Sequence, residues 1–442
     1  MNGSSSESPA LPRVAIITSG YLPVPNVRGG AVEALDTMLV RENEKNPLID
    51  LTVFSSWSPG VDAAVDDIRS TRFLFVRTPG LVRAVDRVIY AVAKYLLRKR
   101  KLMSYRYIAQ RLWYIRRVAK RLSREDFDAV VIENHATLFM TMKKYGNARR
   151  YAGKVYYHLH NEVTNDFGCA HEIANVHKVL GVSNYIIDTL DAFLRAHGEK
   201  GLRPDQRAVW RNCVDTEVFN PDNPDTQRAG REWRGKLGIG SDETVFLFSG
   251  RLTPEKGAEE LLKAFLEADV PHARLVVAGA FFFDSKIASP FEVRLHRMAE
   301  QAGDRVIFTG FVDYSQMPGI YAMADVCVLP SIWDDPAPLA VIEAMASGRP
   351  LITTRSGGIP EYADEGCAIL LERDDRLIGG LADAMRRVAD DGDQSLCAAM
   401  GRLGRNVATA NGTDGYHRDL LSEVASSTPA GVHADESARR RP

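Results

Sequence analysis

Residues 244–257 read TVFLFSGRLTPEKG, and residues 258–266 continue as AEELLKAFL. The first six residues are rich in β-branched and aromatic types, which predicts a strand buried on both faces. The apolar residues of 258–266 recur at helical spacing. Gly250 stands where the strand pattern stops, and the missing Cβ lets a ligand approach the backbone there. The stretch therefore predicts a strand, a tight turn and a helix.

Two cations, Arg251 and Lys256, lie in the turn between this strand and this helix. The start of a helix also carries backbone N–H groups without intrahelical acceptors, and such a place favours anions. With Gly250 beside them, the two cations are suited to clamp a diphosphate. The alternative for this segment alone is an ordinary turn whose two cations face solvent.

The same rhythm of short apolar runs and longer helical patterns extends through the chain. We expect strands in the first half at 14–18, 51–54, 129–132 and 155–157, and in the second half at 244–249, 274–278, 306–309, 326–329, 351–353 and 368–371. Strands separated by helix-length crossovers form parallel sheets with helices on both faces. The chain is thus predicted to be α/β, with two Rossmann-like domains that face each other across a cleft.

Turn residues and composition divide the chain into parts. The cluster NPDNPD at 220–225 is the strongest break in the periodic pattern. We expect the following order: a disordered leader at 1–12, an N-terminal Rossmann-like domain at 13–215 with a basic helical insertion at about 81–123, a hinge at 216–227, a C-terminal Rossmann-like domain at 228–410, a C-terminal helix at 411–426 that can pack back on the N-terminal domain, and a disordered tail at 427–442.

Composition excludes several classes of protein. The 442 residues include 56 basic and 57 acidic side chains, so net charge indicates no partner. Five cysteines are scattered without a C-x-x-C pair, which argues against a disulfide framework and a cysteine zinc site. No apolar run has the length of a spanning helix or of a signal peptide. These features predict a cytoplasmic protein.

A second segment, PSIWDDPAPLAVIEAMASGRP at 330–350, predicts a strand end, a Pro-rich loop and a helix. Asp335 precedes this helix, and Glu343 lies about two turns into it. Two acids near a helix N-terminus can accept hydrogen bonds from sugar hydroxyls. The alternative for Glu343 is a surface charge, but its neighbours are apolar, and an acid in such surroundings needs a hydrogen-bonding partner.

Four segments in order, Gly250–Gly257, Val306–Leu329, Asp335–Pro350 and SGGIPE at 356–361, resemble the GT4 family of retaining glycosyltransferases, which have the GT-B fold. The resemblance is strong over about 240–365. In the first half it is limited to an outline, carried by GGAVE at 29–33, HNE at 160–162 and NCVD at 212–215.

The resemblance implies a hexosyltransferase that uses a nucleotide-sugar donor, with UDP-sugar the usual donor, and a glycan or lipid-linked acceptor in surface polysaccharide or glycoconjugate synthesis. Arg251 and Lys256 would neutralise the leaving diphosphate, so that neither a metal nor another cofactor is expected. Glu343 would hold the ribose. Asp335 would contact the donor sugar and steady positive charge at its anomeric carbon. These four residues are the implied catalytic set in the C-terminal domain.

Further residues complete the implied site. The donor-binding set is expected to comprise Gly29, Gly30, Gly250, Arg251, Lys256, Phe311, Val312, Asp335, Leu339, Ala340 and Glu343. Phe311 and Val312 would border the base, and the Gly29–Gly30 loop would lie against the donor phosphates and the acceptor. A histidine often serves the acceptor end in this family, and Glu133 and His135 are both candidates here.

This sequence departs from the family pattern at three positions, and the first two of them concern the sugar end of the site. Asp335 is one methylene shorter than the usual glutamate, Pro338 replaces a glycine and removes a backbone N–H, and Cys213 stands where a glycine is common. Two other hypotheses therefore stay open: a nucleotide-sugar 2-epimerase of similar fold, and a catalytically silent nucleotide-binding member of an assembly complex.

A basic run from Lys94 to Arg121 contains eleven lysines or arginines, no acid and many aromatic residues. Cations and aromatics together are typical of an interfacial helix, which predicts peripheral contact with the anionic inner face of the cell membrane. The alternative is a pair of helices whose aromatics pack on the domain. No nucleic-acid-binding module accompanies the run, and no such partner is expected. For His158 and His160, which flank Leu159 after a strand, the sequence supports a packing or capping role at least as well as a catalytic one.

Overall fold

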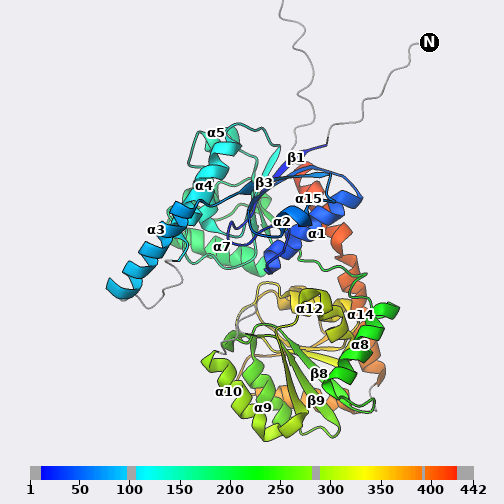
Figure 1. Cartoon of the computed structure of the whole chain (residues 1–442). Coiled ribbons are helices and arrows are strands. Elements are labelled where there is room, and N and C mark those ends of the chain that lie inside the picture. The colour runs from blue at the N-terminus through cyan, green and yellow to red at the C-terminus, as the bar shows by residue number, and fades with distance from the viewer. Residues whose placement is uncertain (1–10, 97–105, 281–288, 391–393, 426–442) are drawn as a thin grey trace, which may run out of the picture.

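The computed structural model describes residues 11–96, 106–280, 289–390 and 394–425, and it consists of two lobes (Figure 1). The N-terminal lobe contains a seven-stranded sheet in the order β3-β2-β1-β4-β5-β6-β7. All of its strand pairs are parallel. The strands are β1 (Arg13–Ile17), β2 (Asp50–Ser56), β3 (Thr71–Val76), β4 (Ala129–Glu133), β5 (Val155–Leu159), β6 (Lys178–Gly181) and β7 (Arg207–Val209).

The C-terminal lobe contains a six-stranded parallel sheet in the order β10-β9-β8-β11-β12-β13. Its strands are β8 (Thr244–Ser249), β9 (Ala273–Ala278), β10 (Val306–Gly310), β11 (Val326–Leu329), β12 (Leu351–Thr354) and β13 (Ala368–Leu371). The predicted fold, two Rossmann-like domains, is confirmed.

Helices cover both sheets (Figure 1). Those of the N-terminal lobe are α1 (Ala31–Lys45), α2 (Val61–Ala64), α3 (Gly80–Ala91), α4 (Ile108–Leu122), α5 (Asn147–Arg150), α6 (Ala170–Ala174) and α7 (Asn184–Ala196). Those that follow are α8 (Pro224–Leu237), α9 (Ala258–Ala268), α10 (Pro290–Ala299), α11 (Met317–Met323), α12 (Leu339–Ala346), α13 (Leu377–Ala389), α14 (Gln394–Ala410) and α15 (Thr413–Ala425).

Burial explains why the central strands were visible in the sequence and three outer ones were not. Residues 245–248 of β8 are buried, as are residues 14–17 of β1. Central parallel strands lie between two helical layers and need continuous apolar runs. The unpredicted strands β3, β6 and β7 lie toward the two edges of the N-terminal sheet and are short or carry polar residues.

The predicted hinge at 216–227 overlaps a helix. Helix α8 begins at Pro224, and the side chain of Asn223 caps it by accepting a hydrogen bond from the Asp225 backbone N–H at 2.9 Å. An Asn-Pro pair is compatible with a turn or with an N-cap followed by proline in the first turn. Here it is the cap, so residues 224–227 are helical.

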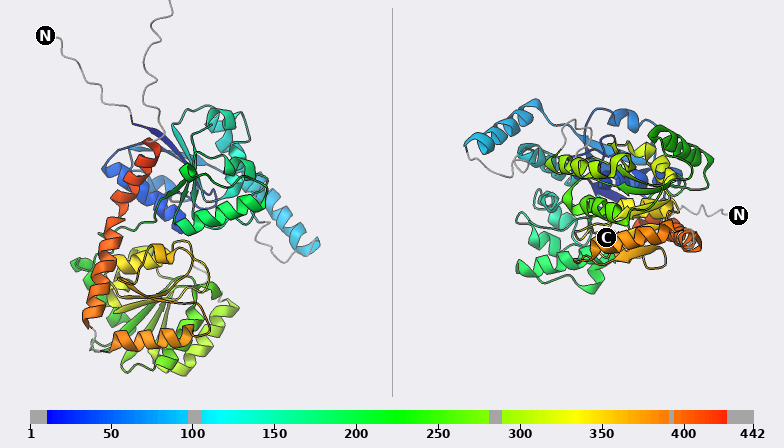
Figure 2. Two further views of the ribbon diagram at one scale, coloured as in Figure 1. Left: turned by 180° about the vertical axis from the view of Figure 1, so that it is seen from behind. Right: turned by 90° about the horizontal axis from the view of Figure 1, so that it is seen from below.

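The C-terminal helices connect the two lobes (Figures 1 and 2). Helix α14 packs on the C-terminal lobe against α12, and α15 crosses to the N-terminal lobe and packs on α1. Trp210 stacks on Tyr416 with ring centroids 4.2 Å apart and donates its indole N–H to the Tyr416 carbonyl. Helix α15 is thus part of the N-terminal core. The predicted leader lies outside the described residues for 1–10, and the predicted tail lies wholly outside them.

The basic insertion consists of α3, a π-helical turn at Val92–Leu96 and α4; residues 97–105 lie outside the described residues. The buried Asp86 carboxylate of α3 accepts backbone N–H bonds from Ala109 and Gln110 at the start of α4. Helix α4 buries Tyr114, Ile115, Val118, Ala119 and Leu122 in the domain core. Tyr114 and Ile115, which the sequence placed in an interfacial stretch, are therefore core residues.

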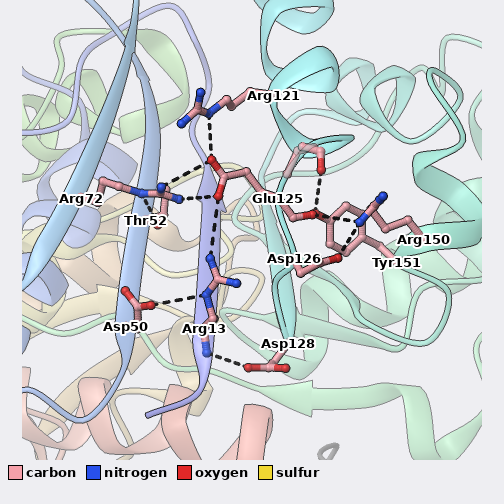
Figure 3. A network of polar contacts seen from close by, with 11 residues as sticks. Arg13, Asp50, Thr52, Arg72, Arg121, Glu125, Asp126, Asp128, Arg150 and Tyr151 are labelled. Atoms are coloured by element: carbon pink, nitrogen blue, oxygen red, sulfur yellow. Dashed lines mark hydrogen bonds and ion pairs between the residues drawn. The ribbon is translucent and has the colours of Figure 1, made fainter. Parts of the chain in front are cut away.

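An ionic network covers the amino-terminal ends of the strands in the N-terminal sheet (Figure 3). The Glu125 carboxylate forms ion pairs with Arg72 at 3.1 Å and with Arg121 at 2.9 Å. Arg13, the first residue of β1, lies 3.8 Å from the same carboxylate. These contacts tie β1, β3 and α4 together at the end of the sheet remote from the other lobe.

Candidate functional site

A pocket of about 290 Å³ lies between the lobes, at the carboxyl ends of both sets of strands. Both lobes contribute to its lining: Ala31, Val32, Leu35, His160, Asn161 and Asn212 come from the first, and Phe248, Ser249, Gly250, Arg251, Lys256, Leu329, Ser331, Trp333, Asp335, Ala337, Pro338, Leu339, Ala340, Val341 and Ile359 come from the second. This is where ligands bind in open parallel sheets.

The turn after β8 places Gly250 and both cations at the pocket. Gly257 has φ 74°, and a Cβ there would lie 1.9 Å from the Pro330 carbonyl oxygen. Only glycine fits this left-handed position, which lets the turn pack on the loop after β11. As a result Gly250, Arg251 and Lys256 all line the pocket.

The two cations of this turn differ in their surroundings. The Arg251 side chain is exposed and has no hydrogen-bonding or ionic partner in the described part of the chain. Lys256 forms an ion pair with the buried carboxylate of Asp335, and its Nζ lies 5.8 Å from the centre of the Trp333 ring. Arg251 is thus available to an anion, whereas Lys256 already neutralises an acid.

Helix α12 begins at the pocket. Leu339 and Ala340, its first two residues, line the pocket, and their backbone N–H groups precede the first intrahelical hydrogen bonds. Asp335 lies just before this helix, and its carbonyl accepts the Gly358 N–H at 2.9 Å. The pocket therefore combines a helix N-terminus with Arg251, a cation that has no partner among the described residues, and this arrangement favours phosphate.

Glu343 lies one turn deeper on α12 and is not among the residues that line the pocket. Tyr321 donates its hydroxyl to the Glu343 carboxylate at 2.8 Å. Burial raises the pKa of Glu343, and hydrogen bonds from Tyr321 and Tyr314 oppose that rise. The predicted partner for this acid is thus a pair of tyrosines. Phe311 and Val312 follow β10 and also lie outside the pocket lining.

The predicted glycine loop precedes α1 in the N-terminal lobe. Gly29 and Gly30 have φ values of 80° and 109°, and Gly30 is the N-cap of α1. The two glycines do not line the pocket, but Ala31 and Val32, the next two residues, do. The loop therefore positions the first residues of α1 at the cleft. The two glycines themselves lie behind the surface that a ligand would contact.

The two acceptor-end candidates lie apart from the pocket lining. Glu133, the last residue of β4, is fully buried, and its Oε1 lies 3.0 Å from Nδ1 of His158. His135 packs edge-on against Tyr21, and burial together with the Arg111 charge lowers its pKa to about 4. The choice between them stays open.

Three residues without an assigned role also line the pocket: His160, Asn212 and Trp333. His160 follows β5, and the rule that sites lie at the carboxyl ends of strands could have identified it. Asn212 donates its side-chain N–H to the Ala337 carbonyl at 3.0 Å, a contact between the lobes that depends on tertiary structure. Trp333 lies in the segment 330–350, but its indole side chain alone did not indicate that it would line the pocket.

No helix in the described ranges is long and apolar enough to cross a bilayer.

The sequence is similar to those of several known proteins. Residues 230–407 match the model of glycosyl transferases group 1. Spore coat protein SA of Bacillus subtilis strain 168 is 28% identical over 80% of this chain and 84% of its own length. D-inositol 3-phosphate glycosyltransferase 2 of Catenulispora acidiphila is 34% identical over 50% of this chain and 52% of its own length.

Solved structures agree in fold. Anabaena Alr3699/HepE in complex with UDP and glucose superimposes with a TM-score of 0.66 at 16% identity, over 94% of this chain and all of that chain. The arrangement of two facing parallel sheets is therefore shared. Taken with the match over residues 230–407, it indicates a glycosyltransferase with the GT-B fold whose C-terminal lobe is similar to the glycosyl transferases of group 1.

Proposed function

We propose that this enzyme transfers a sugar from a UDP-sugar to a glycan or lipid-linked acceptor in glycoconjugate synthesis, with retention of the anomeric configuration and without a metal at the diphosphate. The observation that carries the proposal is the combination of Arg251, which has no partner in the ranges that the structure describes, with the start of α12 at one end of the pocket. Both features stabilise the negative charge that grows on a leaving diphosphate.

Arg251 is the main electrostatic group in this proposal. A guanidinium can donate two parallel hydrogen bonds to a phosphate, and a partly enclosed pocket strengthens that interaction. The backbone N–H groups of Leu339 and Ala340 would serve the second phosphate. Lys256 would share its charge between Asp335 and the diphosphate, which holds the acid next to the donor sugar.

Retention is proposed to occur by displacement on one face of the sugar. A double displacement needs a carboxylate that can attack the anomeric carbon. Asp335 is the one acid among the residues that line the pocket, and it is paired with Lys256. The departing phosphate oxygen would instead accept the proton of the acceptor hydroxyl, so that electrostatic stabilisation carries most of the catalysis.

The choice of UDP rests on similarity, because HepE, which shares the fold, was crystallised with UDP and glucose. Phe311 and Val312 at the end of β10 are proposed to border the base. The test is a thermal-shift screen of the purified protein with UDP-, GDP- and dTDP-sugars, since a ligand that binds only the folded state raises the melting temperature. We expect UDP-sugars to give the largest shift; no shift with any of them would refute the proposed donor.

Turnover separates transfer from epimerisation. An epimerase would convert a UDP-sugar without an acceptor, whereas a transferase releases UDP at full rate only when an acceptor is present. We expect acceptor-dependent UDP release. Conversion of the sugar at C2 in the absence of acceptor would contradict the proposal.

We further propose that α3 contacts an anionic membrane surface and so brings the enzyme to a lipid-linked acceptor. Helix α3 and the turn after it project from the N-terminal lobe (Figures 1 and 2). Five exposed apolar side chains recur there at helical spacing: Leu81, Val85, Val88, Val92 and Tyr95. Arg83, Arg87 and Lys94 are exposed beside them. This face, centred on 81–95 rather than 94–121, has the chemistry of an interfacial helix.

Vesicle sedimentation tests this contact. The wild-type enzyme should pellet with anionic vesicles at low salt and be released at high salt, because surface charges are screened. Val88→Ser should reduce pelleting, whereas Val293→Ser, an equally conservative change at an exposed position of the other lobe, should not. Equal pelleting with neutral vesicles, or equal pelleting of both variants, would contradict the proposal.

A further inference from the structure

Three potential metal ligands converge in the N-terminal lobe, behind the pocket. Glu133 ends β4, and His158 and His160 lie at the end of β5, so two neighbouring parallel strands bring them together. All three side chains are buried, with exposures of 0%, 0% and 6%. Within the described residues, they form a group of histidine and acid donors close enough to hold one ion.

The distances among the three donor atoms suit a single small cation. Nδ1 of His158 lies 3.0 Å from Oε2 of Glu133, Nε2 of His160 lies 3.3 Å from the same oxygen, and the two nitrogens are 3.1 Å apart. Two ligands bound to zinc at 2.0–2.1 Å in tetrahedral geometry are separated by roughly 3.3 Å. The triangle therefore has nearly the size that one zinc ion requires.

Hydrogen bonds alone do not satisfy this triangle. Nδ1 of His158 faces both Glu133 and Nε2 of His160, yet it has either one proton or one lone pair to offer. Oε2 of Glu133 is buried and accepts no well-aligned hydrogen bond, although it lies 3.0 Å from Nδ1 of His158 and 3.3 Å from Nε2 of His160. A cation at the centre would accept a lone pair from each of the three atoms and would remove this conflict.

The surroundings are rich in buried acids. Glu33 and Asp36 of α1 are buried in the same lobe; burial raises the pKa of both, and the charge of Glu133 adds to that rise. Both carboxylate oxygens of Asp36 are buried without a hydrogen-bond partner. In the described part of the chain, no lysine or arginine forms an ion pair with these three acids. Buried charge of one sign is expensive unless it is compensated, and a divalent cation would compensate it.

We propose that Glu133, His158 and His160 bind one divalent transition-metal ion, with zinc as the best match to two imidazoles and a carboxylate. The fourth position is left for a water molecule. The ion joins β4 to β5 directly behind the cleft, and through His160, which lines the pocket, it fixes the acceptor side of the site. It is separate from the donor diphosphate, which the other lobe binds.

The experiment measures metal in enzyme that is purified without a histidine tag and dialysed against metal-free buffer. We expect about one zinc ion per chain by elemental analysis, as a single site with three protein ligands predicts. Replacement by Co²⁺ should give the visible absorption of a tetrahedral centre. A strong chelator should lower the melting temperature, because the metal stabilises the folded state.

Variants assign the site. Glu133→Gln and His160→Asn should lose the bound zinc and the Co²⁺ absorption, and their melting temperatures should no longer respond to the chelator. His171→Asn, at an exposed histidine, should keep the bound metal. The thermal shift with UDP is measured on every variant, so that a folded donor half is verified independently of the proposed sugar transfer.

Two results would overturn the proposal. One is a wild-type enzyme that contains no zinc, gives no Co²⁺ absorption and melts at the same temperature with chelator. The other is unchanged zinc content in both Glu133→Gln and His160→Asn, which would place the ion elsewhere. The wild-type measurements can overturn the proposal even if a variant fails to fold.

Discussion

The carboxyl ends of the strands of the two sheets face each other across the pocket, and the residues there differ in charge between the lobes. The edge of the C-terminal lobe presents Arg251, Lys256 and the start of α12, which are groups that attract anions. The edge of the N-terminal lobe is backed by Glu33, Asp36 and Glu133, accompanied by histidines. Under the proposed function, the C-terminal lobe stabilises the departing diphosphate. The N-terminal lobe is suited to bind a group that carries protons or positive charge.

The opposite end of the N-terminal sheet shows that this chain can compensate an acid when the acid has a structural role. Glu125 is surrounded there by Arg13, Arg72 and Arg121 (Figure 3). Glu133, at the other end of the same sheet, has two histidines and no arginine. Perturbed and uncompensated groups concentrate at functional sites, so the difference points to the cleft edge as the part of this sheet that acts on ligands.

The largest expected effect is at the cationic edge. Arg251→Ala should lower kcat/KM roughly 10²–10³-fold, the usual cost of removing one preorganised donor to a developing anion. Its melting temperature without ligand should not change, because the side chain is exposed and has no partner in the described residues. Steady-state UDP release measures the effect. Arg376→Ala, a highly exposed arginine of the same lobe, is the control, and equal rates in both variants would remove the basis for the proposed clamp.

The paired cation should behave differently from the unpaired one. Lys256→Ala leaves the Asp335 carboxylate buried without a partner, so it should destabilise the enzyme by about 2 kcal/mol, below the cost of breaking a fully buried pair because Lys256 is partly exposed. The double variant Lys256→Ala with Asp335→Ala should recover most of that loss but not the activity. Denaturant unfolding of the three proteins tests this, and purely additive losses would contradict the pairing.

The sequence predicted this lobe better than the other, for physical reasons. The strand over 244–249 and the turn cations are neighbours along the chain, and the acid at 335 belongs to a second local motif at 330–350, so local patterns were sufficient to single out these residues. The Lys256–Asp335 ion pair was not predicted, because it joins two loops 79 residues apart.

The N-terminal half depends more on tertiary contacts. The contact of Glu133 with His158 and His160 follows from the pairing of β4 with β5. The burial of Tyr114 follows from the packing of α4, and a basic sequence does not reveal which face of a helix is turned inward. Sequence patterns drew attention to Glu133 and the two histidines and to the basic helix α4. They could not show that the three side chains form one cluster, or that one face of α4 is buried in the core.

Substitution of Glu343, a buried acid of the C-terminal lobe, should have a smaller effect on stability, and that effect depends on pH. Burial raises the pKa of Glu343 above its ordinary value of 4.5, so the folded chain holds this proton to higher pH than the unfolded chain. Its contribution to stability is therefore complete below pH 4.5 and is lost as pH rises through the raised pKa. Glu343→Gln should thus gain melting temperature relative to wild type at neutral pH and not at pH 4.

The same substitution should weaken the proposed ribose contact. Loss of a hydrogen bond to a charged acceptor costs about 1.5–3 kcal/mol, so the Kd of UDP should rise roughly tenfold or more. Calorimetric titration with UDP measures this, and Tyr321→Phe, which removes one donor to the same carboxylate, is a useful companion. Greater stability together with tighter UDP binding would contradict a role for the ionised acid in donor binding.

The smallest expected effect is at the compensated end of the N-terminal sheet. Glu125→Gln keeps the shape of the side chain and removes its charge from contacts with partly exposed arginines, which should cost about 1 kcal/mol of stability. Added salt should reduce that cost, because the network is screened. Turnover, UDP affinity and zinc content should stay at wild-type values, since Glu125 lies at the edge remote from the pocket. Glu133→Gln, the same substitution at the other edge, should change zinc content, and equal effects of the two variants would mean that the two ends of the sheet do not differ in function.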